Sequence, residues 1–364
     1  MLRVRNLVLL GMCAAMLCSC ARGPYVMGLG HHGPWDLRKV TWEESRAAQD
    51  QLIHQPSMDT FLSQKVREAW DESGEDWQKR LRLEDVGVTL IDLRDPKGPR
   101  IGNVRGDQKT YPASVIKMVY MLATYEWLRE GRISWHDKVR IYENDPTTST
   151  VQVWSLDKAL EEMIGPSNNE ATDGILDLLT GTESGPEMSG DEWEAWKHKR
   201  WAVERYVEHL GLDGIFAIQK TWSNGPKGRE TQFLGQPSGQ HYEFSNSLTT
   251  NATARLLYLI ETGQVVDREA CRRMKKLMRR EKEEFVKYLP ESYGGKVPRG
   301  AKMWSKAGWI STKTHQAAIF DLGGGRKIVL VIFTVHKAVT PGQTSGSSAF
   351  SFVQLLASKI IAQM

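Results

Sequence analysis

The chain has 364 residues, of which 40% are hydrophobic and 25% charged, and its formal net charge is +4. This is the composition of a globular protein with enough length for a sizeable core. Arg3 and Arg5 lie in a segment that export would remove, and without them 46 basic residues face 44 acidic ones. A charge this close to balance gives no reason to expect nucleic acid as a partner.

The first twenty residues have the pattern of an export signal. Arg3 and Arg5 precede an apolar stretch, residues 7–17, that is too short to span a bilayer. It runs into Leu17-Cys18-Ser19-Cys20, which resembles the lipobox of bacterial lipoproteins. The resemblance implies that residues 1–20 form the signal peptide and that Cys20 carries the lipid as the new first residue. The alternatives are a plain secretory signal with incidental cysteines and an apolar helix of a soluble domain.

A lipid-anchored protein needs a link between lipid and fold, and residues 21–40, rich in Gly, His and Pro, predict such a flexible tether. Acyl chains on Cys20 would hold the chain on a membrane surface. Ala21 stands where an Asp commonly marks such a lipoprotein for retention at the inner membrane. In a cell that has an outer membrane, the resemblance therefore implies export to the periplasmic face of that membrane. Cys271, the one cysteine beyond the signal, is expected to be a buried thiol with no disulfide or metal role.

Hydrophobic periodicity divides residues 41–364 into predicted helices and strands. Two strands are expected near residues 85–93 and 101–104, and three more at 303–309, 315–321 and 327–335. The expected helical segments are 41–82, 112–131, 156–164, 169–179, 191–210, 250–262, 271–280 and 348–362. The order is helix, two strands, a long helical block, three strands and a helix.

This order predicts an α/β fold of the α+β type. Strands from both ends of the chain are expected to form one antiparallel five-stranded sheet, flanked by the N-terminal and C-terminal helices. An all-helical subdomain over about residues 111–300 is expected to be inserted between the second and third strands. Residues 41–364 are expected to form one domain.

Three segments of the helical block stand out. Residues 181–203 are rich in Gly, Glu and Trp and predict an insertion, with an amphipathic helix that begins at Asp191. Residues 212–245 form a polar loop of a length that is usually functional or disordered. Residues 272–280 carry six basic side chains, which predict a solvated helix face, with contact to anionic lipid as the alternative.

The pattern that carries chemistry begins at Ser114-Val115-Ile116-Lys117, which opens the apolar helix after Pro112. A spacing of three places the hydroxyl and the amine on one helix face. A Ser hydroxyl needs a neighbouring base to become a nucleophile, and a Lys can serve if burial lowers its pKa. Free N–H groups at the helix start would face an oxyanion. A second copy, Ser155 to Lys158, is predicted to be an ordinary N-cap.

Two further short motifs follow in order. Ser167-Asn168-Asn169 comes directly after Gly165-Pro166, and by itself would be a capped turn. Lys306-Ala307-Gly308-Trp309 lies on a predicted strand, where its Gly would let a substrate backbone approach. By itself this segment would be a strand with a charged rim residue.

Ser-x-x-Lys, Ser-x-Asn and Lys-x-Gly, in this order, resemble the signature of the class A β-lactamase and penicillin-binding family. The resemblance covers about residues 80–364 and implies the β-lactamase/transpeptidase-like fold. It implies that Ser114 forms the acyl-enzyme, with Lys117 as base or proton relay. Ser167 would pass a proton to the leaving nitrogen, Asn169 would hold the substrate amide, and Lys306 would attract the substrate carboxylate.

The third motif carries two further implications and one departure. The backbone N–H groups of Ser114 and Trp309 would form the oxyanion hole, with Gly308 lining the substrate site. Ala307 replaces the Thr or Ser of the family, and so removes a hydroxyl that helps to bind a carboxylate. Lys313-Thr314 does not restore the motif, because His315 follows where a Gly is needed, and we expect this pair in the turn after the strand.

A second departure concerns the long loop. Class A β-lactamases carry there a Glu-x-x-x-Asn whose Glu activates the deacylating water, and no clear copy is found in residues 212–245. Glu230 is the nearest candidate and lacks the Asn. Without that Glu, acylation can occur while hydrolysis is slow.

Three functions remain open on the sequence. The first is a β-lactamase-like acyl-serine hydrolase acting on a β-lactam or a related small-molecule amide. The second is a D-alanyl peptidase or penicillin-binding protein that acts on a cell-wall peptide and deacylates slowly. The third is a non-catalytic envelope protein that uses the fold for binding. None of them calls for a cofactor or metal, and the expected partners are the substrate and, through Cys20, a membrane.

Overall fold

The computed structural model describes residues 38–142, 151–223, 225–235, 237–238, 241–242, 244–338 and 350–364. The predicted signal peptide, Cys20 and nearly all of the predicted tether lie outside the described residues. Within the described part of the chain, no helix is long and apolar enough to cross a membrane.

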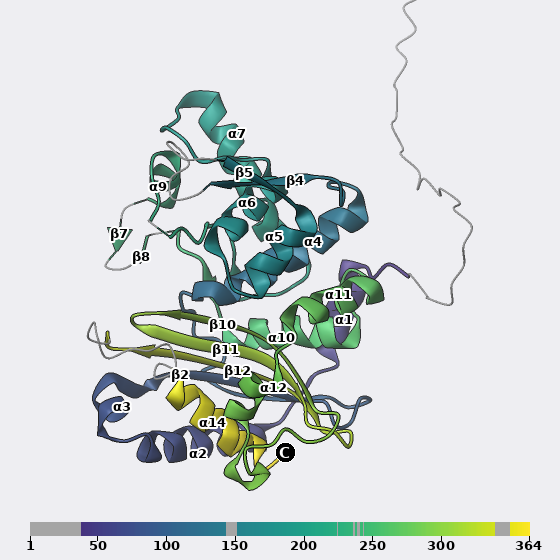
Figure 1. Ribbon diagram of the computed structural model, residues 1–364, viewed down its shortest axis with the longest axis vertical. Coiled ribbons are helices and arrows are strands. Elements are labelled where there is room, and N and C mark those ends of the chain that lie inside the picture. Colours follow the sequence, from purple (N-terminus) through teal and green to yellow (C-terminus); the bar gives the residue numbers. More distant parts are fainter. Residues whose placement is uncertain are drawn as a thin grey trace, which may run out of the picture. The chain divides into compact units, whose positions relative to one another are not determined.

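The centre of the fold is a six-stranded sheet with the strand order β1-β3-β2-β12-β11-β10 (Figure 1). Five strands are antiparallel to their neighbours, as predicted, and the two-residue β1 adds a parallel pair with β3 at one edge. The strands are β1 (Ile53–His54), β2 (Leu81–Asp92), β3 (Arg100–Val104), β10 (Lys302–Ile310), β11 (Lys313–Asp321) and β12 (Lys327–His336). β2 thus pairs with β12 from the other end of the chain, and β10 is left as the outer strand.

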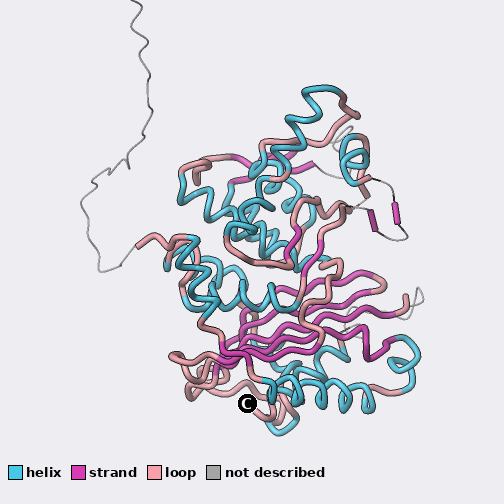
Figure 2. The backbone as a smooth tube through the Cα atoms, turned by 180° about the vertical axis from the view of Figure 1, so that it is seen from behind, coloured by secondary structure: helices cyan, strands magenta, loops and turns pink. Residues whose placement is uncertain are grey.

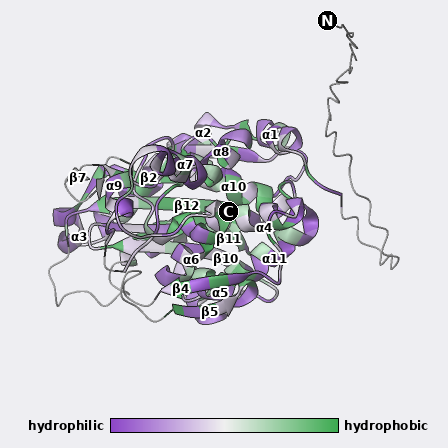
Figure 3. Ribbon diagram, turned by 90° about the horizontal axis from the view of Figure 1, so that it is seen from above, coloured by the Kyte–Doolittle hydropathy of each residue, from purple (hydrophilic) through white to green (hydrophobic). Residues whose placement is uncertain are grey.

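Each face of the sheet is covered by helices, because alternate residues of the strands are apolar on both sides. Leu330 and Ile332 of β12 pack into a core with the outer helices α2 (Pro56–Glu72) and α14 (Ser351–Ile361). Val329 and Val331 point to the opposite face, toward α10 (Thr250–Thr262) and the helical block. Figure 3 shows β12 coloured as hydrophobic, in contrast to the hydrophilic α7.

The helical block lies between β3 and β10 in the sequence. Its helices include η1 (Ala113–Ile116), α4 (Lys117–Glu130), α5 (Leu156–Ile164), α6 (Asn169–Thr180), α7 (Gly190–Arg200), α8 (Ala202–His209), α9 (Arg229–Leu234), α11 (Arg268–Met278), α12 (Lys282–Phe285), η2 (Val286–Tyr288) and η3 (Glu291–Tyr293). α4 is buried from Lys117 to Trp127 and ends at Gly131 in the left-handed conformation, which a glycine adopts without strain.

The prediction of an all-helical subdomain is wrong. β4 (Lys138–Tyr142) and β5 (Val151–Ser155) form an antiparallel pair, visible in Figure 2 as strands among the helices. β4 alternates exposed and buried residues, so Val139 and Ile141 face the core. β6 (Ile215–Phe216) pairs with β9 (Ser247–Leu248), and β7 (Pro237–Ser238) with β8 (His241–Tyr242), so the long loop holds short strands besides α9.

Two smaller expectations also differ from the structure. Residues 41–82 form three helices, α1 (Trp42–Asp50), α2 and α3 (Glu75–Arg80), with β1 between the first two. Trp42, at the first position of the short α1, is 45% exposed. Lys313 and Thr314 begin β11 rather than forming the turn, and the Thr314 hydroxyl is buried against His336.

Candidate active site

Ser114 lies on a strained turn between the sheet and the helical block. It is the second residue of the 3-10 helix η1, which leads directly into α4. Ala113 before it has a φ of 46°, a left-handed conformation that costs a non-glycine residue about 1–2 kcal/mol. Within the described residues the Ser114 hydroxyl has no hydrogen-bond partner, and the residue is partly exposed. The turn therefore presents a free hydroxyl.

The edge strand β10 packs closely against the turn that contains Ser114. A Cβ added to Gly308 would lie 2.8 Å from the Ser114 nitrogen and 2.7 Å from the Pro112 oxygen. Only a glycine fits there, so Gly308 makes room for the nucleophile turn. Because Trp309 follows Gly308 directly, the two segments expected to supply oxyanion N–H groups are in contact. The Trp309 ring itself is 56% exposed.

His315 supports the same turn from the neighbouring strand. It pairs with Gly308 in the sheet, and its Nε2 is 3.0 Å from the carbonyl oxygen of Tyr111. Burial lowers the pKa of His315 to about 4. The ring is therefore neutral at pH 7, with Nε2–H donating to Tyr111, while Nδ1 accepts from the Thr334 N–H at 3.3 Å. In the sequence, His315 stands out only as the residue in place of an expected Gly, and its support of this turn was not predicted.

Lys117 is fully buried and meets the second motif. Its Nζ donates to the Ser167 carbonyl oxygen at 2.7 Å and to the Asn169 Oδ1 at 2.7 Å. The Ser167 Oγ is 3.2 Å away and the Asn168 carbonyl oxygen 3.3 Å. Because Asn169 accepts with its Oδ1, its NH₂ group remains to donate to a substrate carbonyl. The structure thus brings Lys117, Ser167 and Asn169 together.

Lys306 reaches the same point from β10. Its Nζ donates to the Ser167 Oγ at 2.8 Å and to the Ala307 carbonyl oxygen at 3.0 Å. Ser167 itself has a φ of 69°, so a second left-handed residue faces the site. The Ser167 oxygen lies between two lysine amines, and its own hydrogen is free to be donated elsewhere.

Burial lowers the pKa of both lysines, and like charge adds to it at Lys306. Burial lowers the pKa of Lys117 to about 7, against the opposing charges of Asp173 and Glu170. Burial, with the positive charges of Lys117 and Arg280, holds the pKa of Lys306 well below its usual range. A neutral amine at pH 7 is what a general base needs.

Arg280 braces the two segments that meet at Ser167. It was predicted to be part of a solvated basic face, yet it turns inward. Its guanidinium donates to the Ser305 carbonyl oxygen at 2.6 Å and to the Ile164 carbonyl oxygen at 3.3 Å. These contacts connect β10 to the end of α5, from which the chain runs to Ser167.

The second Ser-x-x-Lys copy has the predicted structural role. Ser155 is the N-cap of α5, and its hydroxyl accepts from the Lys158 N–H at 3.3 Å. The Lys158 amine is exposed and lies 4.1 Å from the centre of the Trp154 ring. Identical spacing thus gives a capped surface turn in one place and a buried amine in the other.

Glu230 is not brought to Ser114 or Lys117. It is 1% exposed, and its carboxylate pairs with Arg200 at 2.7 Å and accepts from the Ser184 hydroxyl at 2.9 Å. Lys220 lies 3.6 Å from the same oxygen. Burial alone would raise the pKa of Glu230, but the charges of Arg200 and Lys220 hold it below its usual range. These contacts are those of a structural ion cluster.

The segment 217–221 of the long loop is held by side chains rather than by regular structure. Glu204 accepts from the Ala217 N–H at 2.7 Å, and the Asn246 Oδ1 accepts from the two following N–H groups. Asp173 accepts from the Thr221 N–H at 2.7 Å. Burial raises the pKa values of Asp173 and Glu204 to about 7. The spacing of Asn169, Asp173 and Asp177 by four could have shown that they share one face of α6.

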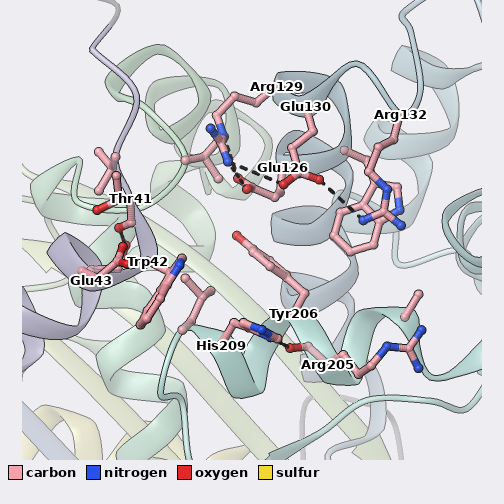
Figure 4. A pocket seen from close by; sticks show the side chains of 16 residues that line it. Thr41, Trp42, Glu43, Glu126, Arg129, Glu130, Arg132, Arg205, Tyr206 and His209 are labelled. Carbon is pink, nitrogen blue, oxygen red and sulfur yellow. Dashed lines mark hydrogen bonds and ion pairs between the residues drawn. The ribbon is translucent and has the colours of Figure 1, made fainter. Parts of the chain in front are cut away.

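A separate cavity of about 460 Å³ lies between α1, α4 and α8 (Figure 4). Trp42, Tyr206 and His209 line it together with Arg129 and Glu126. It contains none of the residues of the Ser114 site. Across the described ranges, no group of three or more His, Cys, Asp or Glu side chains could hold a metal ion.

A family model described as the Beta-lactamase enzyme family matches residues 81–363. Among solved structures, one titled "Structure of PBP-A" is similar, with a TM-score of 0.58 at 16% identity over 86% of this chain and 97% of that one. A mutant of PBP-A, titled as an acyl-enzyme complex with penicillin G, gives a TM-score of 0.58 at 18% identity, over 84% of this chain and 96% of the other. No sequence among the curated proteins matches this chain.

A β-lactamase from Sphaerobacter thermophilus is similar over 82% of this chain and 96% of its own, with a TM-score of 0.57 and 16% identity. At these identities the structural similarity establishes the fold, and the family match establishes descent. Since that match spans both the sheet and the helical block, the chain belongs to the β-lactamase enzyme family.

Proposed function

We propose that this chain is an acyl-serine hydrolase in which Ser114 attacks a β-lactam or a related amide and Lys117 removes its proton. One observation carries the proposal: two buried lysines from different elements converge on the hydroxyl of Ser167, beside a free Ser114. A fold without catalysis has no need to bury two amines with so few opposite charges around them.

The proton path follows from these contacts. Neutral Lys117 takes the Ser114 proton as the oxygen attacks the amide carbon, and backbone N–H groups at residues 114 and 309 stabilise the oxyanion. When the C–N bond breaks, the Ser167 hydroxyl donates its proton to the leaving nitrogen, and is reprotonated by the ammonium of Lys117 through their 3.2 Å contact. The products are an ester on Ser114 and a neutral amine.

Recognition of the substrate rests on polar groups that remain available. The NH₂ group of Asn169 is oriented by Lys117 and would donate to the substrate amide oxygen. The negative charge of a substrate carboxylate beside Lys306 would favour the ammonium form, against the burial and the charges of Lys117 and Arg280 that lower its pKa, and this ammonium would then hold the carboxylate. Ala307 offers no hydroxyl for this carboxylate, so charge rather than a hydroxyl contact would hold it.

A second candidate is a D-alanyl peptidase or penicillin-binding protein that deacylates slowly. One observation favours it: the carboxylate of Glu230 is committed to Arg200 and Ser184, and Thr221 is the loop residue attached to α6 beside Asn169. Among the described residues of the long loop, Glu230 is therefore not available to activate water at a Ser114 ester. The PBP-A structures, one of them an acyl-enzyme, are consistent with it as similar folds. A non-catalytic envelope protein is the third candidate, suggested by the Trp-rich insertion.

Labelling with a fluorescent penicillin separates these functions. We expect a covalent adduct on Ser114, identified by mass spectrometry, that is abolished in Ser114→Ala and retained in Ser155→Ala. Absence of any adduct on the wild type would overturn both catalytic candidates and leave the binding protein. Hydrolysis of a chromogenic cephalosporin then distinguishes the hydrolase from the slowly deacylating peptidase. Rapid turnover supports the hydrolase, and a stable adduct with negligible turnover supports the peptidase.

We also propose that the chain is exported and anchored through a lipid on Cys20, at the periplasmic face of the outer membrane. The proposal rests on the lipobox-like residues 17–20. Labelled palmitate fed to expressing cells should be incorporated by the wild type and not by Cys20→Ala. Incorporation that persists in Cys20→Ala, or fails in both, would contradict it.

A further inference from the structure

Helix α11 (Arg268–Met278) turns a strongly basic face to solvent. Ala270, Cys271, Met274 and Met278 form its buried stripe. The remaining positions are dominated by basic residues, of which Arg268, Arg272, Arg273, Lys276 and Arg279 are exposed. We call these five residues the basic face. The apolar stripe is already packed against the core, so the basic face is not a means of burying the helix.

Few acidic side chains neutralise the basic face. Glu269 alone pairs with both Arg272 and Arg273. Asp267 caps the start of α11 by accepting from the Ala270 N–H. Glu261 forms ion pairs with Lys275 and Lys327. Arg268, Lys276 and Arg279 have no ion pair within the described ranges. The basic face therefore keeps a surplus of positive charge, although the whole chain is close to neutral.

The basic face lies beside the point at which the folded unit begins. The Val40 N–H donates to the Val266 carbonyl oxygen at 2.9 Å, and the Ser45 hydroxyl to the Gln264 carbonyl oxygen at 2.8 Å. α1 thus packs against the residues that lead into α11, as Figure 1 shows. Lys39, which is exposed, adds positive charge at this end, whereas Arg38 pairs with Glu44.

We infer that the basic face of α11 is a docking surface for the anionic phospholipid headgroups of a membrane. Several exposed guanidinium groups in a row match the phosphates of such a surface. The contact is electrostatic and peripheral, because the apolar residues of α11 pack against the core, Leu277 partly buried and the others fully, and none of them is exposed to enter the bilayer.

The surface is suited to a protein that is already held near a bilayer. A patch of this size binds weakly by itself, since each basic side chain near an anionic surface strengthens binding about fivefold. A tether converts such weak binding into an intramolecular step with a high effective concentration. The inference goes beyond the proposed hydrolase and does not depend on acylation; the lipid on Cys20 would only strengthen the contact.

Vesicle binding tests the inference without the lipid anchor. Leu37–Met364 forms one compact unit, so the chain from Ala21 onward is used. We expect it to co-sediment with vesicles of phosphatidylethanolamine and phosphatidylglycerol but not with phosphatidylcholine vesicles, and to be released at about 0.5 M salt. The triple variant Arg268→Gln, Lys276→Gln, Arg279→Gln should bind at least tenfold more weakly.

A matched control changes the same charge elsewhere. Arg67→Gln, Lys199→Gln, Lys287→Gln removes three exposed basic side chains outside α11 and should leave vesicle binding unchanged. Equal loss in both variants, no binding of the wild type, or preference for a DNA duplex over the vesicles would each overturn the inference. Penicillin labelling of both variants should match the wild type, which distinguishes failure here from failure of the proposed function.

Discussion

Two groups of buried charges lie along one face of α6, and their charges are balanced differently. At Asn169, the amines of Lys117 and Lys306 have only neutral oxygens as hydrogen-bond partners. Two turns further on, Asp177 and Glu230 pair with Arg200 and Lys220, two carboxylates for two cations. The first group has strongly lowered lysine pKa values, whereas the pKa of Lys220 is raised.

The difference shows how the same fold leaves the amine of Lys117 easy to deprotonate and keeps the amine of Lys220 charged. A buried amine without a carboxylate partner is easily deprotonated, so it is available for proton transfer. A buried amine with such a partner remains charged and holds segments together. The insertion 181–203, whose purpose the sequence left open, supplies Arg200 to the second group and so attaches α7 to α9 and α6.

The largest effect is expected from removing the base of the first group. Lys117→Gln should slow penicillin acylation by about 10²–10⁴-fold, because it removes the buried amine that lies three residues from Ser114 at the start of the same helical segment. The measurement is the rate of adduct formation with a fluorescent penicillin at pH 7. Lys158→Gln is the matched control at the exposed copy of the motif and should leave the rate unchanged. A Lys117→Gln rate close to that of the wild type would assign the base elsewhere.

The second group should respond in stability rather than in chemistry. Arg200→Ala leaves Glu230 buried with a weaker counter-charge, and should lower the free energy of unfolding by about 3–5 kcal/mol. Urea denaturation followed by tryptophan fluorescence measures the change. In Arg200→Met with Glu230→Gln both charges are removed, so this double variant should recover much of the loss. If Arg200→Ala unfolds at the urea concentration of the wild type, the cluster is not a brace.

The smallest effect is expected from Asp173, which lies on α6 between the two groups. Its negative charge raises the pKa of Lys117, and acylation needs Lys117 neutral, so the rate should rise as the pH passes through about 7. Asp173→Asn removes the charge, lowers the pKa of Lys117 and should shift this rise to lower pH. The amide oxygen of Asn can still accept from the Thr221 N–H, so the loop should stay attached.

Asp177→Asn provides the comparison, one turn along the same face of α6. Asp177 pairs with Lys220 rather than acting on Lys117. Its substitution should reduce stability and leave the pH profile of acylation in place. An identical shift in both variants would mean that the whole cluster, not Asp173, sets the pKa of Lys117.

Much of the fold was predictable because its signals are local. The alternation of β12, the Ser155 cap and the left-handed Gly131 each depend on a few neighbouring residues. β4 and β5 were missed because they are short and pair across residues 143–150. The inward turn of Arg280 was missed because its acceptors, Ile164 and Ser305, are backbone oxygens far away in the sequence.

The site was predictable in its residue types but not in its electrostatics. The order of the three motifs named Ser114, Lys117, Ser167, Asn169 and Lys306, and the structure brings the last four together. Glu230 shows what motif spacing cannot predict. Its carboxylate lies in the expected loop but pairs with Arg200 rather than with a residue of the Ser114 site, and this depends on how the insertion packs.

Ala113, directly before Ser114, and Ser167, at the Lys117 amine, both hold left-handed backbone conformations without being glycine. Such residues persist only where the surrounding packing leaves them no other shape. The packing of the fold therefore holds the backbone of the site in a strained conformation. On heating, loosening of the edge strand β10 would relax this strain first. Heat should then inactivate the protein at a temperature below that at which its core melts.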